Sequence, residues 1–126
     1  MRETFCKDER LCSKRLISLL FEKGEKRFSY PFRITTFKIQ LDSGFPAQLL
    51  ISVPRSLFKN ACDRNKIKRL IREAYRKHKY ILYDSLSEKQ EQMLICMTYI
   101  SKEIVSYQIM TEKIIVLLLR FKEEKR

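Results

Sequence analysis

The 126-residue sequence has no tryptophan, one histidine, two glycines and three prolines. So little glycine and proline excludes collagen-like, linker-like and low-complexity chains. The four cysteines include no pair with the two-residue gap of a zinc knuckle, so we expect no structural zinc site. We expect them to be free thiols in a reducing compartment, and small buried residues: Cys6, Cys12, Cys62 and Cys96.

Long apolar runs are also missing. The longest, residues 114–119, is far too short to span a membrane, and the first ten residues lack the apolar core of a signal peptide. Hydrophobic residues nevertheless make up 44% of the sequence, enough to form a core. We therefore expect one cytoplasmic domain over residues 1–126, with 1–9 and 123–126 frayed.

Acidic residues are few relative to basic ones. The sequence has 27 Lys and Arg against 15 Asp and Glu, a net charge of +12. A folded domain this basic repels itself, and a polyanionic partner relieves that repulsion. Nucleic acid is the first candidate partner, and an anionic membrane surface is the second.

Hydrophobic periodicity predicts three helices, at residues 13–22, 63–83 and 106–122. Ser13 and Asp63 are suitable N-caps for the first two, and Gly24 lies just beyond the end of the first. Together with the strands, this gives an α+β domain of order α-β-β-β-α-β-α, in which helices pack on a mixed sheet.

Four strands are predicted, at residues 26–29, 32–41, 47–53 and 93–99. The alternation slips between Ile34 and Phe37, which predicts a bulge in the second strand. Turn residues before 47 predict that the second and third strands form an antiparallel hairpin. The continuous apolar run at 93–99 is typical of a buried central strand.

The long predicted helix and the loop before it carry most of the charge. The sequence from Arg55 to Lys79 has ten basic residues and two acidic ones, so its net charge is +8. Like charges three and four residues apart destabilise a helix unless an anion is bound. Guanidinium groups bind phosphate bidentately, so this face predicts contacts with the phosphates and base edges of a nucleic acid. One arc about 100° wide holds Asn65, Lys68, Arg69, Arg72, Arg76 and Lys79.

Other functions compete with this interpretation. A non-catalytic RNA-binding protein of the ribosomal type has the same features and stays open. A nuclease with its own metal ions needs converging carboxylates, whereas the acids here are scattered. A membrane-bound helix would carry large exposed apolar residues, whereas Ala74 and Tyr75 suit packing on a sheet. A helix-turn-helix DNA binder needs a partner helix across a tight turn, whereas the charged helix here follows a predicted strand and a short loop.

The stretch from Ile51 to Arg76 strongly resembles the bacterial ribonuclease P protein subunit family. The family pattern is a strand ending near Ser-Val, a basic loop, then Arg-Asn-Arg, two residues, Arg, two residues and Arg. The sequence matches with Arg64-Asn65-Lys66, Arg69 and Arg72, and Lys66 replaces an arginine. The resemblance extends from about residue 10 to 121, through the spacing of Arg10, Leu11, Ile17, Phe21, Gly24 and Phe32.

This resemblance implies both fold and activity. The implied fold has a left-handed βαβ crossover and is shared with a domain of ribosomal protein S five. The implied activity is that of an accessory subunit of an endoribonuclease that removes 5′ leaders from precursor tRNA. Catalysis would come from a partner RNA holding Mg²⁺, and the protein would supply neither a catalytic residue nor a cofactor.

The resemblance also implies partners and site residues. The partners would be ribonuclease P RNA and precursor tRNA, with neither DNA nor membrane. The RNA-binding residues would be Arg55, Lys59, Arg64, Asn65, Lys66, Lys68, Arg69, Arg72 and Arg76. A cleft for the leader, between the first helix and the sheet, would be lined by Ile17, Phe21, Phe32, Thr35 and Ser52. The family's usual aromatics at Ile17 and Thr35 are replaced.

Overall fold

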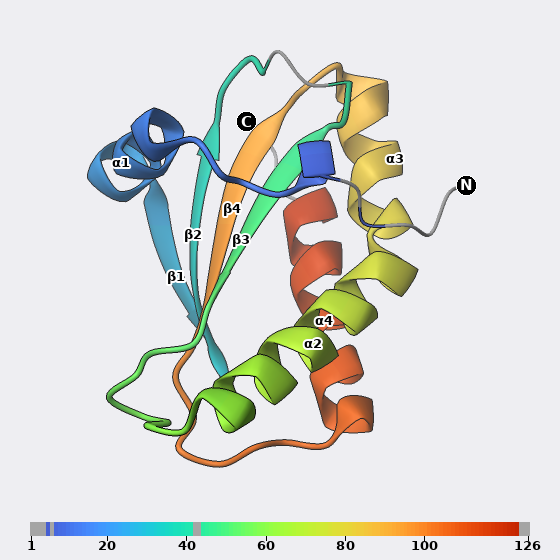
Figure 1. Ribbon diagram of the computed structural model, residues 1–126. Helices are drawn as coiled ribbons and strands as arrows, with labels where there is room; N and C mark the ends of the chain where they lie inside the picture. The colour runs from blue at the N-terminus through green and yellow to red at the C-terminus, as the bar shows by residue number, and fades with distance from the viewer. Residues whose placement is uncertain (1–4, 6, 42–43, 124–126) are drawn as a thin grey trace.

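The computed structural model describes residues 5, 7–41 and 44–123. It confirms the α+β class, with one mixed sheet in the order β1-β2-β4-β3 (Figure 1). The strands are β1 (Glu25–Ser29), β2 (Phe32–Lys38), β3 (Ala47–Ser52) and β4 (Met93–Tyr99). The helices are the 3-10 turn η1 (Lys7–Glu9), α1 (Lys14–Lys23), α2 (Ala61–His78), α3 (Tyr80–Lys89) and α4 (Tyr107–Glu123).

Helices cover both faces of the sheet. Figure 1 shows α1 on one side, and α2, α3 and α4 on the other. Because side chains alternate along a strand, the sheet contributes to two separate apolar cores. The large core lies under α2–α4 and includes Ile34, Ile67 and Ile95, whereas the small core lies under α1 and includes Leu20 and Leu94.

Helix α1 forms where the sequence predicts it. The Ser13 side chain accepts a hydrogen bond from the Leu16 backbone N–H at 3.3 Å, as an N-cap does. Gly24 ends the helix close against β2. A Cβ atom at this position would lie 2.2 Å from the Leu20 carbonyl oxygen and 2.7 Å from Thr35 Cγ2. Glycine therefore allows the end of α1 to rest directly on the sheet.

The predicted hairpin between the second and third strands is wrong. β4 lies between them, antiparallel to β2 and parallel to β3, and α2 and α3 form the crossover from β3 to β4. The apolar run of β4 is buried on both faces, which is what the middle of a two-sided sheet requires. The antiparallel hairpin is instead β1–β2, turning at Tyr30 and Pro31.

The predicted bulge in β2 is also wrong. The pairing of β2 with β1 and with β4 runs without interruption, and the strand ends at Lys38 rather than at residue 41. Thr35 and Thr36 point to opposite faces, and both are buried. The apparent slip in alternation therefore arises because helices cover both faces of this strand.

The predicted helix at 63–83 is two helices. Asn60, rather than Asp63, is the N-cap of α2, and its Oδ1 accepts a hydrogen bond from the Cys62 backbone N–H at 3.0 Å. Asp63 instead lies in the first turn, where a carboxylate is favourable. Lys79 separates α2 from α3, and Gln90 caps α3 in the left-handed conformation, with a φ of 55°.

A buried ion pair ties the N-terminal segment to the junction of α2 and α3. The Glu9 carboxylate is fully buried, and it accepts hydrogen bonds from Lys79 Nζ at 2.5 Å and from the Tyr83 hydroxyl at 2.6 Å. The predicted fraying of residues 1–9 is therefore wrong for 7–9, while 1–4 and 6 lie outside the described residues. At the other end, α4 includes residue 123, and 124–126 lie outside the described residues.

The cysteines agree only in part with their prediction. Cys96 is buried, whereas Cys12 and Cys62 are exposed; all three are free thiols. Cys6 lies outside the described residues. Over the ranges that the structure describes, none of the helices is both long and apolar enough to cross a membrane.

Candidate nucleic-acid interface

The outer face of α2 presents a row of cations. The helix buries Ile67, Ile71 and Ala74 in the large core, so its opposite side faces solvent. Exposed polar residues there and on the preceding loop are Arg55, Lys59, Asn65, Lys66, Arg69 and Arg72, and Lys68 is half-buried. We call these seven residues the cationic face. Within the described part of the chain, Lys66, Arg69 and Arg72 form no ion pair.

Arg64 has a different environment from the other cations of α2. Its Nη1 donates hydrogen bonds to the carbonyl oxygens of Phe58, at 2.7 Å, and of Lys59, at 2.9 Å. The side chain therefore fastens the loop to the first turn of α2. Arg64 fixes the loop that carries Lys59, besides bringing its own charge to this end of the helix.

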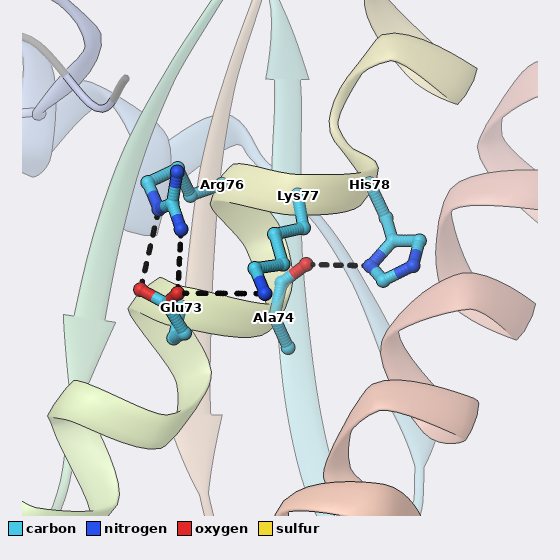
Figure 2. A network of polar contacts seen from close by, with 5 residues as sticks. All are labelled: Glu73, Ala74, Arg76, Lys77 and His78. Atoms are coloured by element: carbon cyan, nitrogen blue, oxygen red, sulfur yellow. Dashed lines mark hydrogen bonds and ion pairs between the residues drawn. The ribbon is translucent and has the colours of Figure 1, made fainter. Parts of the chain in front are cut away.

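The cationic face ends near Arg72. Figure 2 shows Arg76 and Lys77 turned toward Glu73, with Arg76 Nη2 at 2.5 Å and Lys77 Nζ at 4.0 Å from its carboxylate. The hydrogen bond from Arg76 holds the pKa of Glu73 below its usual value. The placement of Lys79 on the solvent-facing arc is wrong, because its ammonium group is buried against Glu9. His78 Nδ1 lies 3.0 Å from the carbonyl oxygen of Ala74, one turn earlier on the same helix (Figure 2).

A second candidate surface lies on the sheet face that carries α1. Phe21 on α1 is 47% exposed, and Ile17 is half-buried against the small core. Ser52 is half-buried on this side of the sheet, as its register with Thr98 shows. Thr35 also points to this side, but it is only 3% exposed beneath the end of α1.

Phe32 does not belong to this surface. It alternates with Arg33 along β2 and points into the large core, where its ring packs at 6.1 Å from that of Tyr99. Phe32 is completely buried. Its predicted place in the cleft is wrong, because strand alternation puts it on the face opposite α1.

The N-terminal segment adds a cation that the sequence prediction misses. A pocket of about 190 Å³ lies between this segment, β3 and α2, and its lining includes Arg10, Cys12, Lys68 and Arg72. Arg10 is held there by a parallel bridge to Leu49. The sequence gives no local signal for this placement, because the contact joins residues about forty positions apart.

The described residues include no group of three His, Cys, Asp or Glu side chains that could hold a metal ion. The groups that the two surfaces present are the cations of α2 and its loop, the hydroxyl of Ser52 and the apolar side chains of Ile17 and Phe21. Such groups bind phosphates and bases.

The mixed sheet, the helices on both faces and the cationic α2 define a class: a small basic α+β domain. A sequence model of the ribonuclease P family matches residues 5–120. The chain therefore belongs to the ribonuclease P protein family. It is 33% identical over 102 residues to the ribonuclease P protein component of Porphyromonas gingivalis, covering 81% of this chain and 74% of that protein.

Solved structures show the same fold. The ribonuclease P protein from Thermotoga maritima is similar with a TM-score of 0.71 at 27% identity, covering 89% of this chain and 96% of that one. The ribonuclease P protein from Staphylococcus aureus is similar with a TM-score of 0.65 at 21% identity, covering 98% of each chain.

Proposed function

We propose that this protein is the accessory subunit of ribonuclease P. It binds the ribonuclease P RNA and the 5′ leader of precursor tRNA, and so assists endonucleolytic removal of the leader. The observation that carries this proposal is the cationic face of α2, in a chain that belongs to the ribonuclease P protein family. Catalysis is assigned to the RNA and its Mg²⁺, and this chain supplies no catalytic residue.

The cationic face suits the RNA backbone. Lys66, Arg69 and Arg72 are exposed on one rigid helix and form no ion pair among the described residues, so a phosphate does not have to displace an internal partner. Each phosphate contact releases counterions, so affinity falls steeply with salt. Asn65, in the second turn of α2, has an amide that can bond a base edge or a 2′-hydroxyl.

The face that carries α1 suits a single strand. Phe21 offers an exposed ring, and Ser52 offers a hydroxyl at the end of β3. Leaders of different sequence need contacts that tolerate any base, and stacking on aromatic side chains does so. After Ser52 the chain enters the loop of Arg55 and Lys59, so the sheet face and the cationic face are joined at that end of the domain.

Reconstitution tests this proposal. The protein is mixed with a bacterial ribonuclease P RNA and a precursor tRNA at low Mg²⁺, with RNA-only and protein-only controls. We expect cleavage only from the mixture. The double variant Arg69→Ala, Arg72→Ala should lose most of this activation, whereas Lys113→Ala, an exposed lysine on α4, should retain it.

Other results would contradict the proposal in different ways. Cleavage by the protein alone would move the active site onto this chain. RNA binding without activation, with the RNA still active at high Mg²⁺, would favour a non-catalytic RNA-binding protein of the ribosomal type.

A further inference from the structure

We propose that Phe28 and Arg33 form a stacking site for a nucleotide of the single-stranded leader. The site lies on the part of the sheet that α1 leaves open. This inference rests on the proposed function, because it assigns residues to the leader-binding face.

The register of the sheet places both side chains on the face that carries α1. Phe28 is paired with Arg33 across β1 and β2. Their neighbours along the strands point the other way, since Phe32 and Ile34 lie in the large core. Arg27 also points to that opposite side, where its guanidinium lies 6.0 Å from the Phe121 ring centroid.

These two residues begin a row that crosses the sheet. Arg33 is paired with Thr98 on β4, and Thr98 is paired with Ser52 on β3. With strands about 4.8 Å apart, the row from Phe28 to Ser52 extends about 14 Å. It begins at an exposed aromatic ring and ends beside the loop that leads into the cationic face.

Both side chains are available to a ligand. Phe28 is 62% exposed, the largest value among the large hydrophobic residues that the structure describes. Arg33 is exposed, and within the described ranges its guanidinium forms neither a hydrogen bond nor an ion pair. An exposed ring beside a guanidinium without a partner suits a nucleotide, whose base stacks on the ring while its phosphate binds the cation.

The sheet face that carries α1 is open at Phe28 but covered at Thr35. Thr35 stands on the same strand face, two residues beyond Arg33, but Gly24 and the end of α1 cover it. The open part of the face therefore starts at the Phe28–Arg33 pair. The structure thus assigns base stacking to β1 and β2 at this pair, and not to position 35.

The test measures the affinity of the reconstituted holoenzyme for precursor tRNA and for mature tRNA. Phe28→Ala should weaken binding of precursor tRNA by at least about fivefold, the lower limit for loss of one stacked base, and leave mature tRNA unchanged. Phe28→Tyr should restore precursor binding, because it keeps the ring. Tyr80→Ala removes a ring that is 43% exposed on α3, and it should have no effect.

A fluorescent adenine analogue, placed in turn at each leader position, locates the nucleotide. We expect quenching at one or two neighbouring positions with the unchanged protein and with Phe28→Tyr, and its loss with Phe28→Ala. Arg33→Ala should weaken precursor binding too, and raising the salt concentration should reduce the difference between this variant and the unchanged protein.

The outcomes separate this inference from the proposed function. If the unchanged protein favours precursor over mature tRNA and Phe28→Ala keeps that preference, the stacking site is overturned and the proposed function stands. Equal weakening for both RNAs would overturn the site as well, since it indicates a contact outside the leader or damage to the fold. A protein that never distinguishes the two RNAs would overturn both.

Discussion

Arg64 and Arg69 lie on the same helix, but their surroundings differ. The Arg64 guanidinium is bonded to two carbonyl oxygens of the preceding loop. Arg69 is exposed and has no ion pair within the described part of the chain. Sequence spacing treats these two arginines as equivalent, whereas the structure gives the first a role in local folding.

Replacing Arg69 by Ala should weaken binding of ribonuclease P RNA by about 1–3 kcal/mol. It should leave the free energy of unfolding within about 0.5 kcal/mol of that of the unchanged protein. Arg64→Ala should weaken binding and also lower the free energy of unfolding by about 1 kcal/mol, because two carbonyl groups lose their donor. Filter binding and urea titrations measure these quantities, with Lys113→Ala as control. Unchanged affinity in both variants would reject the assigned face.

Breaking the Glu9–Lys79 pair should strongly destabilise the folded protein. Both side chains are almost completely buried, so Lys79→Met removes an ammonium group from beside a buried carboxylate. We expect the free energy of unfolding to fall by about 3–5 kcal/mol. The double variant with Glu9→Gln should recover part of this loss, as urea titration would show. A loss below about 1 kcal/mol for Lys79→Met would mean that the pair does not anchor the N-terminal segment.

At the scale of elements, the close contact between α1 and β2 depends on Gly24, which has no side chain. Gly24→Ala would force a Cβ atom to within 2.2 Å of the Leu20 carbonyl oxygen, so α1 or β2 must move. We expect a loss of about 1–3 kcal/mol in the free energy of unfolding. Gly44→Ala is the matched control, because nothing lies within 4 Å of its added Cβ. Equal stability of the two variants would mean that α1 adjusts without cost.

The sequence predicted elements better than their pairing. Apolar periodicity located α1, α4 and the central strand β4 within a few residues, because each pattern is local. It missed the parallel pairing of β3 with β4, since sequence periodicity does not identify the partner of a strand. It also joined α2 and α3, because the apolar stripe continues through Lys79, whose burial depends on Glu9, seventy residues away.

For the candidate site too, the sequence predicts the local features but not those that depend on how the strands pair. The cations of α2 from Lys66 to Arg72 lie on the surface as the helical wheel requires. The resemblance places Phe32 on the wrong face, because the spacing of a family motif does not show which way a strand residue points. Phe28 and Arg33 were not identified, because their proximity depends on the register of two strands.

At the scale of the whole molecule, stability should decrease at alkaline pH. Burial raises the pKa of both Tyr75 and Tyr83, while unfolding returns both to about 10. Below pH 9 both states keep these protons, and the stabilising contribution is complete. Above pH 10 the unfolded chain loses protons that the folded protein retains, so stability falls as pH rises.

Urea titrations between pH 8 and pH 11 measure this dependence. Tyr75→Phe removes one titrating group. Above pH 10, the stability of this variant should therefore fall less steeply than that of the unchanged protein, and the two slopes should differ by up to about 1.4 kcal/mol per pH unit. The same variant at pH 8 provides the control for lost packing. Parallel curves for the two proteins would show that Tyr75 titrates normally in the folded state.

The central position of β4 has a consequence for synthesis of the chain. β2 and β3 share no ladder, and each is paired with β4, which is made only after residue 92. Before β4 is made, the β1–β2 hairpin can form, but β3 has no neighbouring strand. The nascent chain therefore has to keep its apolar β3 segment soluble until β4 has followed it, and its basic helix emerges before the sheet is closed.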